Sequence, residues 1–233
     1  MSMKNIINSI KKKLRKIKIL QRPYSKIKVH FIMKKNQKNL HHYGYEVLGN
    51  VVNILEKNGI NTFCAYGTLL GFIRDGGFIK NDSDIDMGIV STDDFSWDRL
   101  EEVLTYIGLK KTRHFELNDN ITEQSYIMNG VNIDFFLYTE TEYGMTANVY
   151  WIDENRKYKF DGGHSVMYRD APKIDKVEFI KINSINVPIP SNYEEYLVVN
   201  YGKDWRIPDP NFKPEKFVRT VKDLEAKRVD FKD

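Results

Sequence analysis

The sequence is poor in cysteine, in long apolar runs and, over its first forty residues, in acidic side chains. Cys64 is the single cysteine among 233 residues and stands between apolar neighbours. We therefore expect no disulfide framework and no cysteine-bound zinc site, which agrees with a reducing compartment. The chain has no run near the roughly 18 apolar residues of a membrane-spanning helix and no apolar core of a secretory signal. The expectation is a cytoplasmic protein that does not cross a membrane.

The absence of acids from residues 1–40 divides the chain by charge. This segment carries thirteen Lys or Arg and no Asp or Glu, and the remainder holds 23 Lys or Arg against 32 Asp or Glu. The formal net charge of +4 therefore conceals a basic segment and an acidic one. We expect a basic arm at 1–40 and one domain at 41–233, in which we find no internal repeat or low-complexity linker.

The arm has the pattern of a basic amphipathic helix. Apolar residues recur at spacings of three and four from Ile6 to Leu20, and lysine and arginine occupy the other faces. The helix is expected to stop at Arg22 and Pro23. A helix of this kind can lie on an anionic membrane, where each basic residue contributes about 1 kcal/mol.

Residues 4–38 are thus candidates for peripheral binding at the inner face of a membrane. Docking of the arm on its own chain or on a partner subunit is the alternative. Nucleic acid is not favoured, because Tyr24 and Phe31 are not interleaved as stacking platforms.

The domain at 41–233 has an α+β pattern. Helical periodicity marks 41–57 and 97–107, and strand-like runs occupy 60–66, 83–90, 109–117, 124–128, 131–138, 145–152, 157–160 and 177–187. A short helix is expected from Thr68, as its N-cap, to Arg74, and another after a capping box of Ser191 and Glu194. The last twenty residues are charged and are expected to be helical.

Two carboxylates stand one residue apart inside the apolar run at 83–90. Asp84 and Asp86 are separated by Ile85, so in a strand both side chains project from one face, about 7 Å apart along the backbone. Like charges beside apolar neighbours resist burial unless a cation is present. An Asp-x-Asp pair alone is more often a solvated strand end, so other features must support a Mg²⁺ site.

Three further features support that site. Gly67 and Thr68 lie at a strand-to-helix junction, where backbone N–H groups can bind a phosphate. Asp134 is an acid in an otherwise apolar strand, and a strand next to the Asp84 and Asp86 pair would make it a third metal ligand. Arg74 can reach the same phosphate with a forked guanidinium.

The order of these parts resembles the nucleotidyltransferase superfamily. Within it, the run from Gly67 to Arg74, the Asp82–Asp86 segment, the strand around Asp134 and the closing Tyr201–Trp205 segment resemble the LicD family, to which fukutin-type proteins are related. The resemblance spans about residues 45–210. It implies a nucleotidyltransferase-like mixed or antiparallel sheet flanked by helices.

The resemblance also implies an activity. Family members transfer a substituted phosphate, such as phosphocholine or a polyol phosphate, from a CDP-activated donor to a glycan, with Mg²⁺ or Mn²⁺. By position, Asp84 and Asp86 would hold the metal, and Asp134 would be a third ligand or the base for the acceptor hydroxyl. Gly67, Thr68 and Arg74 would hold the donor phosphates. The acceptor would be a cell-surface polysaccharide or lipid-linked glycan, as in capsule or lipopolysaccharide biosynthesis.

The chain departs from the family pattern just before the acidic pair. The family often has Pro-Trp before a denser acidic run, whereas this chain has Lys80 and Asn81 and then Asp82. Lys80 and Asp82 are therefore secondary candidates with open roles. His164, in an expected loop, could reach the mouth of the site, and Trp205 could stack on a base or sugar.

Two other functions stay open. The protein could be a nucleotidyltransferase that moves a nucleoside monophosphate from an NTP to a small molecule, a protein or RNA. It could also be a non-catalytic membrane-binding relative, although the presence of Asp84, Asp86 and Asp134 argues against this.

Overall fold

The computed structural model describes residues 18–153, 155–159 and 161–231. Its helical segments are α2 (Lys18–Lys57), α3 (Tyr66–Leu70), the π-helical turn η1 (Gly71–Asp75), α4 (Trp97–Tyr106), α5 (Tyr193–Tyr201) and the 3-10 turn η2 (Pro214–Phe217). Its strands are β1 (Thr62–Cys64), β2 (Asp84–Val90), β3 (Lys110–Leu117), β4 (Asn120–Met128), β5 (Val131–Thr141), β6 (Gly144–Trp151), β7 (Gly163–Ala171), β8 (Val177–Ile182), β9 (Ile185–Pro190) and β10 (Arg219–Asp230).

Six of these strands close into a ring. The hydrogen-bonded order is β5-β4-β3-β10-β7-β6, and β6 pairs again with β5. Closure depends on the length of β5, whose first part pairs with β4 and whose last residues, Tyr138–Thr141, pair with β6. A closed ring leaves no unpaired strand edge. The α+β class is confirmed, but the expected sheet flanked by helices is here a six-stranded barrel.

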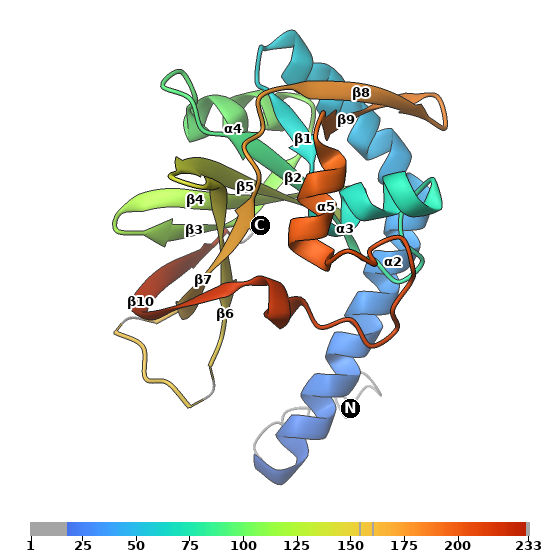
Figure 1. Cartoon of the computed structure of the whole chain (residues 1–233). Helices are drawn as coiled ribbons and strands as arrows, with labels where there is room; N and C mark the ends of the chain where they lie inside the picture. Colours follow the sequence, from blue (N-terminus) through green and yellow to red (C-terminus); the bar gives the residue numbers. More distant parts are fainter. Residues whose placement is uncertain (1–17, 154, 160, 232–233) are drawn as a thin grey trace.

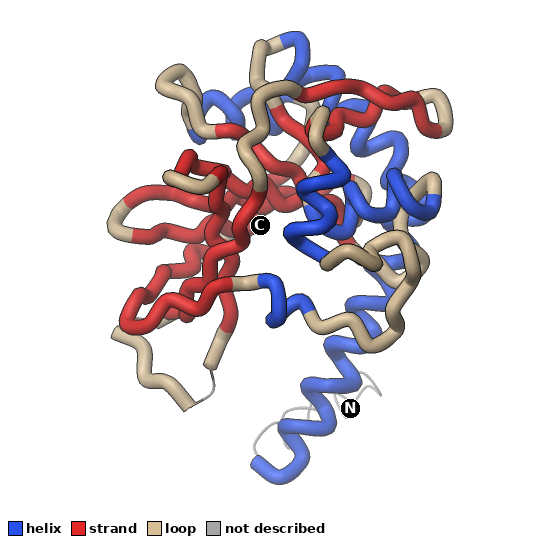
Figure 2. Tube along the Cα trace, viewed as in Figure 1, coloured by secondary structure: helices blue, strands red, loops and turns tan. Residues whose placement is uncertain are grey.

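Strands β1 and β2 extend from the barrel toward the helices. β2 runs parallel to β5, and β1 pairs antiparallel with β2. Most strands gather in one half of the molecule and α2, α3 and α5 in the other (Figure 2). The main core lies between α2 and the β1–β2–β5 sheet, where Leu48, Val51, Phe63 and Ile85 are fully buried. Because this core surrounds β2, it holds the acidic strand in place.

Helix α2 is longer than expected and crosses the expected boundary at residue 40. It runs without a break from Lys18 to Lys57, so the predicted stop at Arg22 and Pro23 is wrong. A proline near the start of a helix disrupts few hydrogen bonds, and packing further along decides where the helix persists. Leu40 is fully buried, and the Asn39 amide donates to the Gly130 carbonyl at 3.0 Å.

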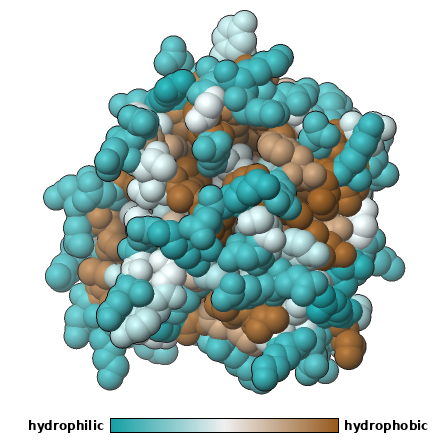
Figure 3. Space-filling view, turned by 45° about the horizontal axis from the view of Figure 1, so that its top comes forward, coloured by the Kyte–Doolittle hydropathy of each residue, from teal (hydrophilic) through white to brown (hydrophobic). Residues whose placement is uncertain are grey.

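The start of the expected arm helix lies outside the described residues. The N-terminal part of α2, which begins at Lys18, projects beyond the rest of the molecule (Figure 1). The projecting part exposes apolar side chains, including Val29 at 57% and Phe31 at 69%. No described helix has the length and apolar composition required to span a membrane. Hydrophilic side chains cover most of the face seen in Figure 3, with apolar patches between them.

Several other elements differ from expectation. Residues 163–171 and 219–230 form β7 and β10, and the 177–187 run lies in a β8–β9 hairpin. Of the expected strand at 157–160, the described residues 157–159 are not in a strand. The C-terminal segment was therefore wrongly expected to be helical. β10 is rich in charged residues that suit an exposed helix, but its pairing with both β3 and β7 overrides that local preference.

Candidate functional site

The pairing of β2 with β5 brings the predicted carboxylates together. In this parallel register Asp86 is directly opposite Asp134, and Asp84 is opposite Asn132. Residues in register on adjacent parallel strands project from the same face, as do positions i and i+2 of one strand. Asp84, Asp86 and Asp134 therefore share one face of the sheet, as the sequence predicted.

Burial and repulsion between neighbouring acids raise the pKa values of Asp82, Asp84 and Asp86. Burial, and then the charges of Asp134 and Asp82, raise the pKa of Asp84 to about 6. Burial and the neighbouring acids raise the pKa of Asp86 well above its usual range. Burial also raises the pKa of Asp82 to about 6, although Arg74 and His41 act in the opposite direction. A positive charge placed beside these acids would favour their ionised forms.

Arg113 on β3 partly balances Asp134. Its Nη2 donates to Asp134 Oδ2 at 2.9 Å and contacts Glu123 Oε1 at 3.4 Å. Burial, followed by the charge of Asp134, raises the pKa of Glu123 to about 8. The other carboxylate oxygen, Asp134 Oδ1, is buried and has no hydrogen-bond partner. One acceptor in the cluster is thus left for a ligand.

Asp86 and Asp134 line a cavity of about 640 Å³, whereas Asp82 and Asp84 are not among its lining residues. Its lining comes from barrel strands, the start of α3, the end of α5 and the segment after α5. That segment runs from α5 to β10 (Figure 1). Four predicted site residues line the cavity: Gly67, Asp86, Asp134 and His164. Its other lining residues include Tyr66, Arg113, Phe115, Glu123, Phe136, Tyr150, Trp151, Ile152, Arg169, Tyr201, Phe212, Pro214 and Arg228.

The start of α3 is built differently from the expected helix cap. Thr68 is not the N-cap, because α3 begins at Tyr66 after Ala65 and has no side-chain cap. The Thr68 hydroxyl is fully buried and accepts a hydrogen bond from the Asp86 N–H at 2.9 Å. Thr68 thus ties α3 to the acidic strand. A Cβ at Gly67 would lie 3.0 Å from Asp82 Oδ2, so glycine lets this carboxylate approach the backbone.

Tyr66 adopts a strained backbone at the cavity wall. Its φ is +42°, a region that a bulky residue rarely occupies. Its N–H donates to the Tyr196 hydroxyl at 3.4 Å, and Tyr196 is bonded in turn to the Tyr138 hydroxyl at 2.6 Å. Strain of this kind is common where a site needs a side chain in a fixed position.

The remaining predicted residues lie outside the lining of this cavity. Arg74 forms a double hydrogen bond with its neighbour Asp75, at 2.7 Å for both contacts. Lys80 is exposed, and its carbonyl accepts from a ring nitrogen of His41 at 3.1 Å. Trp205 is buried in the core, with the Arg206 guanidinium 4.1 Å from its ring. His164 does line the cavity, but it lies on β7 and not in the expected loop.

Sequence reasoning missed four residues that line the cavity: Tyr66, Arg113, Glu123 and Arg169. Glu123 carries a weak signal, since it is an acid next to the strand-like run at 124–128. Tyr66 directly precedes the glycine that was singled out. Arg113 and Arg169 lie on β3 and β7, whose positions beside the acidic strands depend on barrel closure. No local pattern could have identified these two arginines.

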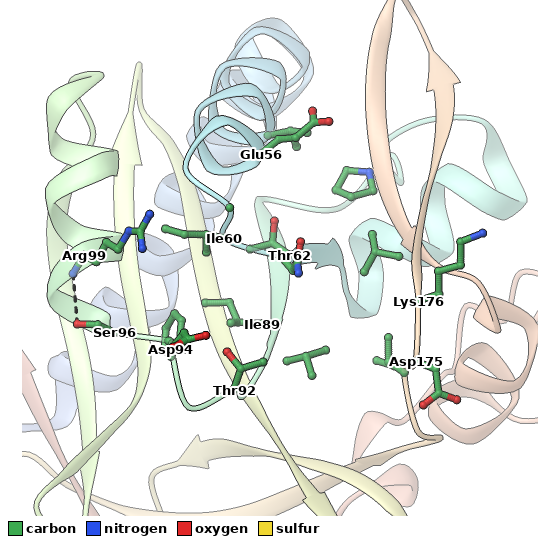
Figure 4. A pocket seen from close by; sticks show the side chains of 18 of the residues that line it. Glu56, Ile60, Thr62, Ile89, Thr92, Asp94, Ser96, Arg99, Asp175 and Lys176 are labelled. Carbon is green, nitrogen blue, oxygen red and sulfur yellow. Dashed lines mark hydrogen bonds between the residues drawn. The ribbon is translucent and has the colours of Figure 1, made fainter.

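A second cavity, of about 500 Å³, lies at the other end of β2. Figure 4 shows Glu56 and Ile60 near the end of α2, Thr62 of β1, and Arg99 and Ser96 at the start of α4 around it. The Ser96 hydroxyl accepts from the Arg99 N–H and caps α4. None of the predicted site residues is among the described residues that line this cavity.

The acidic cluster fits a divalent cation by the chemistry of its donors. Carboxylate oxygens are the ligands that Mg²⁺ and Mn²⁺ prefer, and Asp134 Oδ1 is buried without a partner. Among the described residues, no three His, Cys, Asp or Glu side chains already converge on one metal position. Metal binding by Asp84, Asp86 and Asp134 stays a prediction.

A family model identifies the class of protein. The model described as "LicD/FKTN/FKRP, nucleotidyltransferase domain" matches residues 59–192, which include β1 to β9 and the acidic cluster. The chain belongs to this family, as the sequence motifs indicated. Membership supports a transferase of phosphate-containing groups as the class of activity.

Individual relatives have low sequence identity to this chain. Ribitol-5-phosphate transferase FKTN from Homo sapiens is 28% identical over 169 residues, which cover 70% of this chain and 33% of the relative. The protein of the same name from Mus musculus is 27% identical over 170 residues, with the same coverage. The match thus spans about a third of these relatives. The crystal structure of ANT(2")-Ia in complex with adenylyl-2"-tobramycin has a TM-score of 0.36 and 13% identity over 72% of this chain and 79% of its own, too weak to carry an argument.

We predict that Thr68→Val lowers the free energy of unfolding by about 1–3 kcal/mol, because the buried Asp86 N–H loses its acceptor. Thr68→Ser keeps that acceptor and is the matched control. Urea unfolding followed by circular dichroism measures both variants. Equal stability of Thr68→Val and the wild type would contradict the structural role of this hydroxyl.

Proposed function

We propose that the protein transfers a substituted phosphate from a CDP-activated donor to a hydroxyl of a glycan. The observation that carries this proposal is the carboxylate cluster of Asp84, Asp86 and Asp134, of which Asp86 and Asp134 line a cavity that also contains arginines. The chain's family and its likeness to ribitol-5-phosphate transferases support a polyol phosphate as the transferred group. Phosphocholine is the second candidate.

The proposed reaction is a displacement at phosphorus. The acceptor hydroxyl oxygen forms a new bond to the phosphorus that carries the substituent, the bond from that phosphorus to the bridging oxygen breaks, and CMP leaves with the electron pair. Asp134, whose Oδ1 has no partner, is the candidate to take the hydroxyl proton. Asp84 and Asp86 are the candidates to hold Mg²⁺ or Mn²⁺, which would neutralise charge on the phosphate oxygens when bound.

The acids and the cavity also suit the alternative of nucleoside monophosphate transfer from an NTP. That reaction uses the same ligands for metal and phosphate but releases pyrophosphate instead of CMP. A relative that only binds membranes has no need for three buried, mutually repelling acids, so we rank it last.

Donor turnover tests the proposal. The protein is incubated with Mg²⁺, a glycan acceptor and either CDP-ribitol, CDP-glycerol, CDP-choline or NTPs, and the released nucleotide is identified by chromatography. We expect CMP from a CDP-polyol, and a loss of more than about 100-fold in rate for Asp86→Ala. Release of pyrophosphate from an NTP would establish the alternative, and no reaction with any donor would refute both.

Metal binding has a readout that does not need the substrate. We expect millimolar Mg²⁺ to raise the thermal midpoint of the wild-type protein above its value in excess chelator, because the ion relieves repulsion among the acids. Asp86→Asn removes one of these charges, so it should stabilise the protein in chelator and abolish the response to Mg²⁺. The same Mg²⁺ response in wild type and Asp86→Asn, measured by scanning fluorimetry, would exclude Asp86 as a ligand.

We further propose that the N-terminal part of α2 and the basic residues before it bind an anionic membrane. This part of α2 exposes Val29, Phe31, Ile32 and Met33 next to Lys34 and Lys35. Apolar side chains among basic ones suit the interface of an anionic bilayer. Binding there would place the cavity near a lipid-linked acceptor at the inner face of the membrane.

Vesicle sedimentation measures this binding. We expect the protein to pellet with vesicles of phosphatidylglycerol and phosphatidylcholine at low salt, and much less with phosphatidylcholine alone. Phe31→Ser combined with Ile32→Ser should weaken pelleting, whereas Tyr106→Ser, an exposed aromatic on α4, serves as the control. Equal pelleting with both kinds of vesicle would rule out an electrostatic membrane surface.

A further inference from the structure

Arg169 on β7 is a half-buried cation, two of whose three guanidinium nitrogens are buried without a partner. It lines the same cavity as Gly67, Asp86 and Asp134. Its Nε and Nη2 atoms are buried and have no hydrogen-bond partner. A guanidinium in this state has lost its water without gaining an anion, which is costly.

The other arginines with described side chains all have oxygen partners. Arg74, Arg113, Arg206, Arg219 and Arg228 donate to carboxylates, and Arg99 and Arg156 donate to backbone carbonyls. Five of these arginines pair with a carboxylate, and Arg113 does so inside the same cavity as Arg169. The lack of such a partner inside the cavity therefore sets Arg169 apart.

Two tyrosines hold the Arg169 guanidinium. Its Cζ atom lies 4.4 Å from the centre of the Tyr66 ring and 5.8 Å from that of Tyr201. Aromatic faces attract a desolvated cation, yet they leave the N–H groups unpaired. The strained backbone of Tyr66 fixes one of these rings. The guanidinium is thus positioned before any ligand arrives.

Arg169 also lies within electrostatic reach of the acidic cluster. Its charge opposes the rise in the pKa of Asp86, which identifies the two as neighbours across the cavity. A phosphate group is the ligand that suits this pairing, because it can accept hydrogen bonds from a guanidinium while a carboxylate-bound cation neutralises its other side.

We propose that Arg169 is the residue that binds the phosphate oxygens of the donor, supported by Tyr66 and Tyr201. This inference rests on the proposed function and names the phosphate contact of that site. It also gives Arg169 the role that the sequence suggested for Arg74, whose guanidinium is bound by Asp75. Because Arg169 is unpaired, its donors need not be freed from another partner when phosphate binds.

Binding of inorganic pyrophosphate tests Arg169 without any assumption about the donor. The affinity is measured by calorimetry at one fixed millimolar Mg²⁺ concentration for the wild type, Arg169→Met, Arg169→Lys and Arg206→Met. We expect Arg169→Met to weaken binding by about 10- to 100-fold, since charge-assisted hydrogen bonds are lost. Arg169→Lys keeps the charge but not the fork, so it should weaken binding several-fold. Arg206 is the control, because it also lies over an aromatic ring but is paired with Glu194. Arg206→Met should leave the pyrophosphate affinity unchanged.

Stability distinguishes a binding role from a structural one. Arg169→Met removes an unpaired buried charge, so its thermal midpoint in metal-free buffer should match or exceed that of the wild type. A lower midpoint with unchanged pyrophosphate affinity would make Arg169 structural and overturn the inference. If Arg169→Met fails to fold, Arg169→Lys decides, because wild-type affinity in that variant would refute the forked contact.

The donor assay separates this inference from the proposed function. With a reactive CDP donor, Arg169→Met should raise KM and lower kcat/KM, and unchanged kinetics would refute the phosphate contact. Loss of pyrophosphate binding in Arg169→Met together with no turnover of any CDP donor would instead refute the proposed function and leave Arg169 as an anion-binding residue. Loss of pyrophosphate binding in Arg74→Met but not in Arg169→Met would return the role to Arg74.

Discussion

The parallel pairing of β2 with β5 is the contact on which the rest of the structure depends. It places Asp86 opposite Asp134 and Asp84 one step along the same face, within a partly buried sheet. Three acids in that position repel one another, as the raised pKa values of Asp84 and Asp86 indicate. Their neighbours must therefore compensate for this charge or hold the strands together against it.

The surrounding elements do both. Arg113 offsets the negative charge of Asp134 through an ion pair, in which its Nη2 lies 2.9 Å from Asp134 Oδ2. Thr68 binds the backbone of Asp86 and so fixes α3 on the acidic strand. The core between α2 and the β1–β2–β5 sheet supplies the apolar burial that keeps β2 in register. The cost of gathering three acids is thus spread over packing, one ion pair and one buried hydrogen bond.

Barrel closure then completes the cavity. β3 contributes Arg113 and β7 contributes Arg169. β3 is joined to the acidic strand β5 through β4 and β7 through β6, and β10 closes the ring by pairing with both. The segment after α5 adds Phe212 and Pro214 on the way to β10. Acids and arginines thereby face one space from separate strands, which is the arrangement that phosphate transfer requires. The C-terminal strand is as necessary to the site as the acidic motif.

The sequence by itself determined the acidic half of the site. The spacing of Asp84 and Asp86, and the single acid of the strand around Asp134, follow from a period of two residues, which is a local property. Those patterns were sufficient to predict β2, β5 and the LicD family, to which the chain belongs.

Only the tertiary structure decided the basic half and the shape around it. Arg74 is near the acids in sequence but pairs with Asp75, whereas Arg169 is distant in sequence and enters the cavity. Thr68 binds a neighbouring strand instead of capping its own helix, and β10 is a strand despite its helical composition. Each of these outcomes depends on a partner far along the chain. Local propensity contributes less than about 1 kcal/mol per residue, so long-range pairing and burial override it.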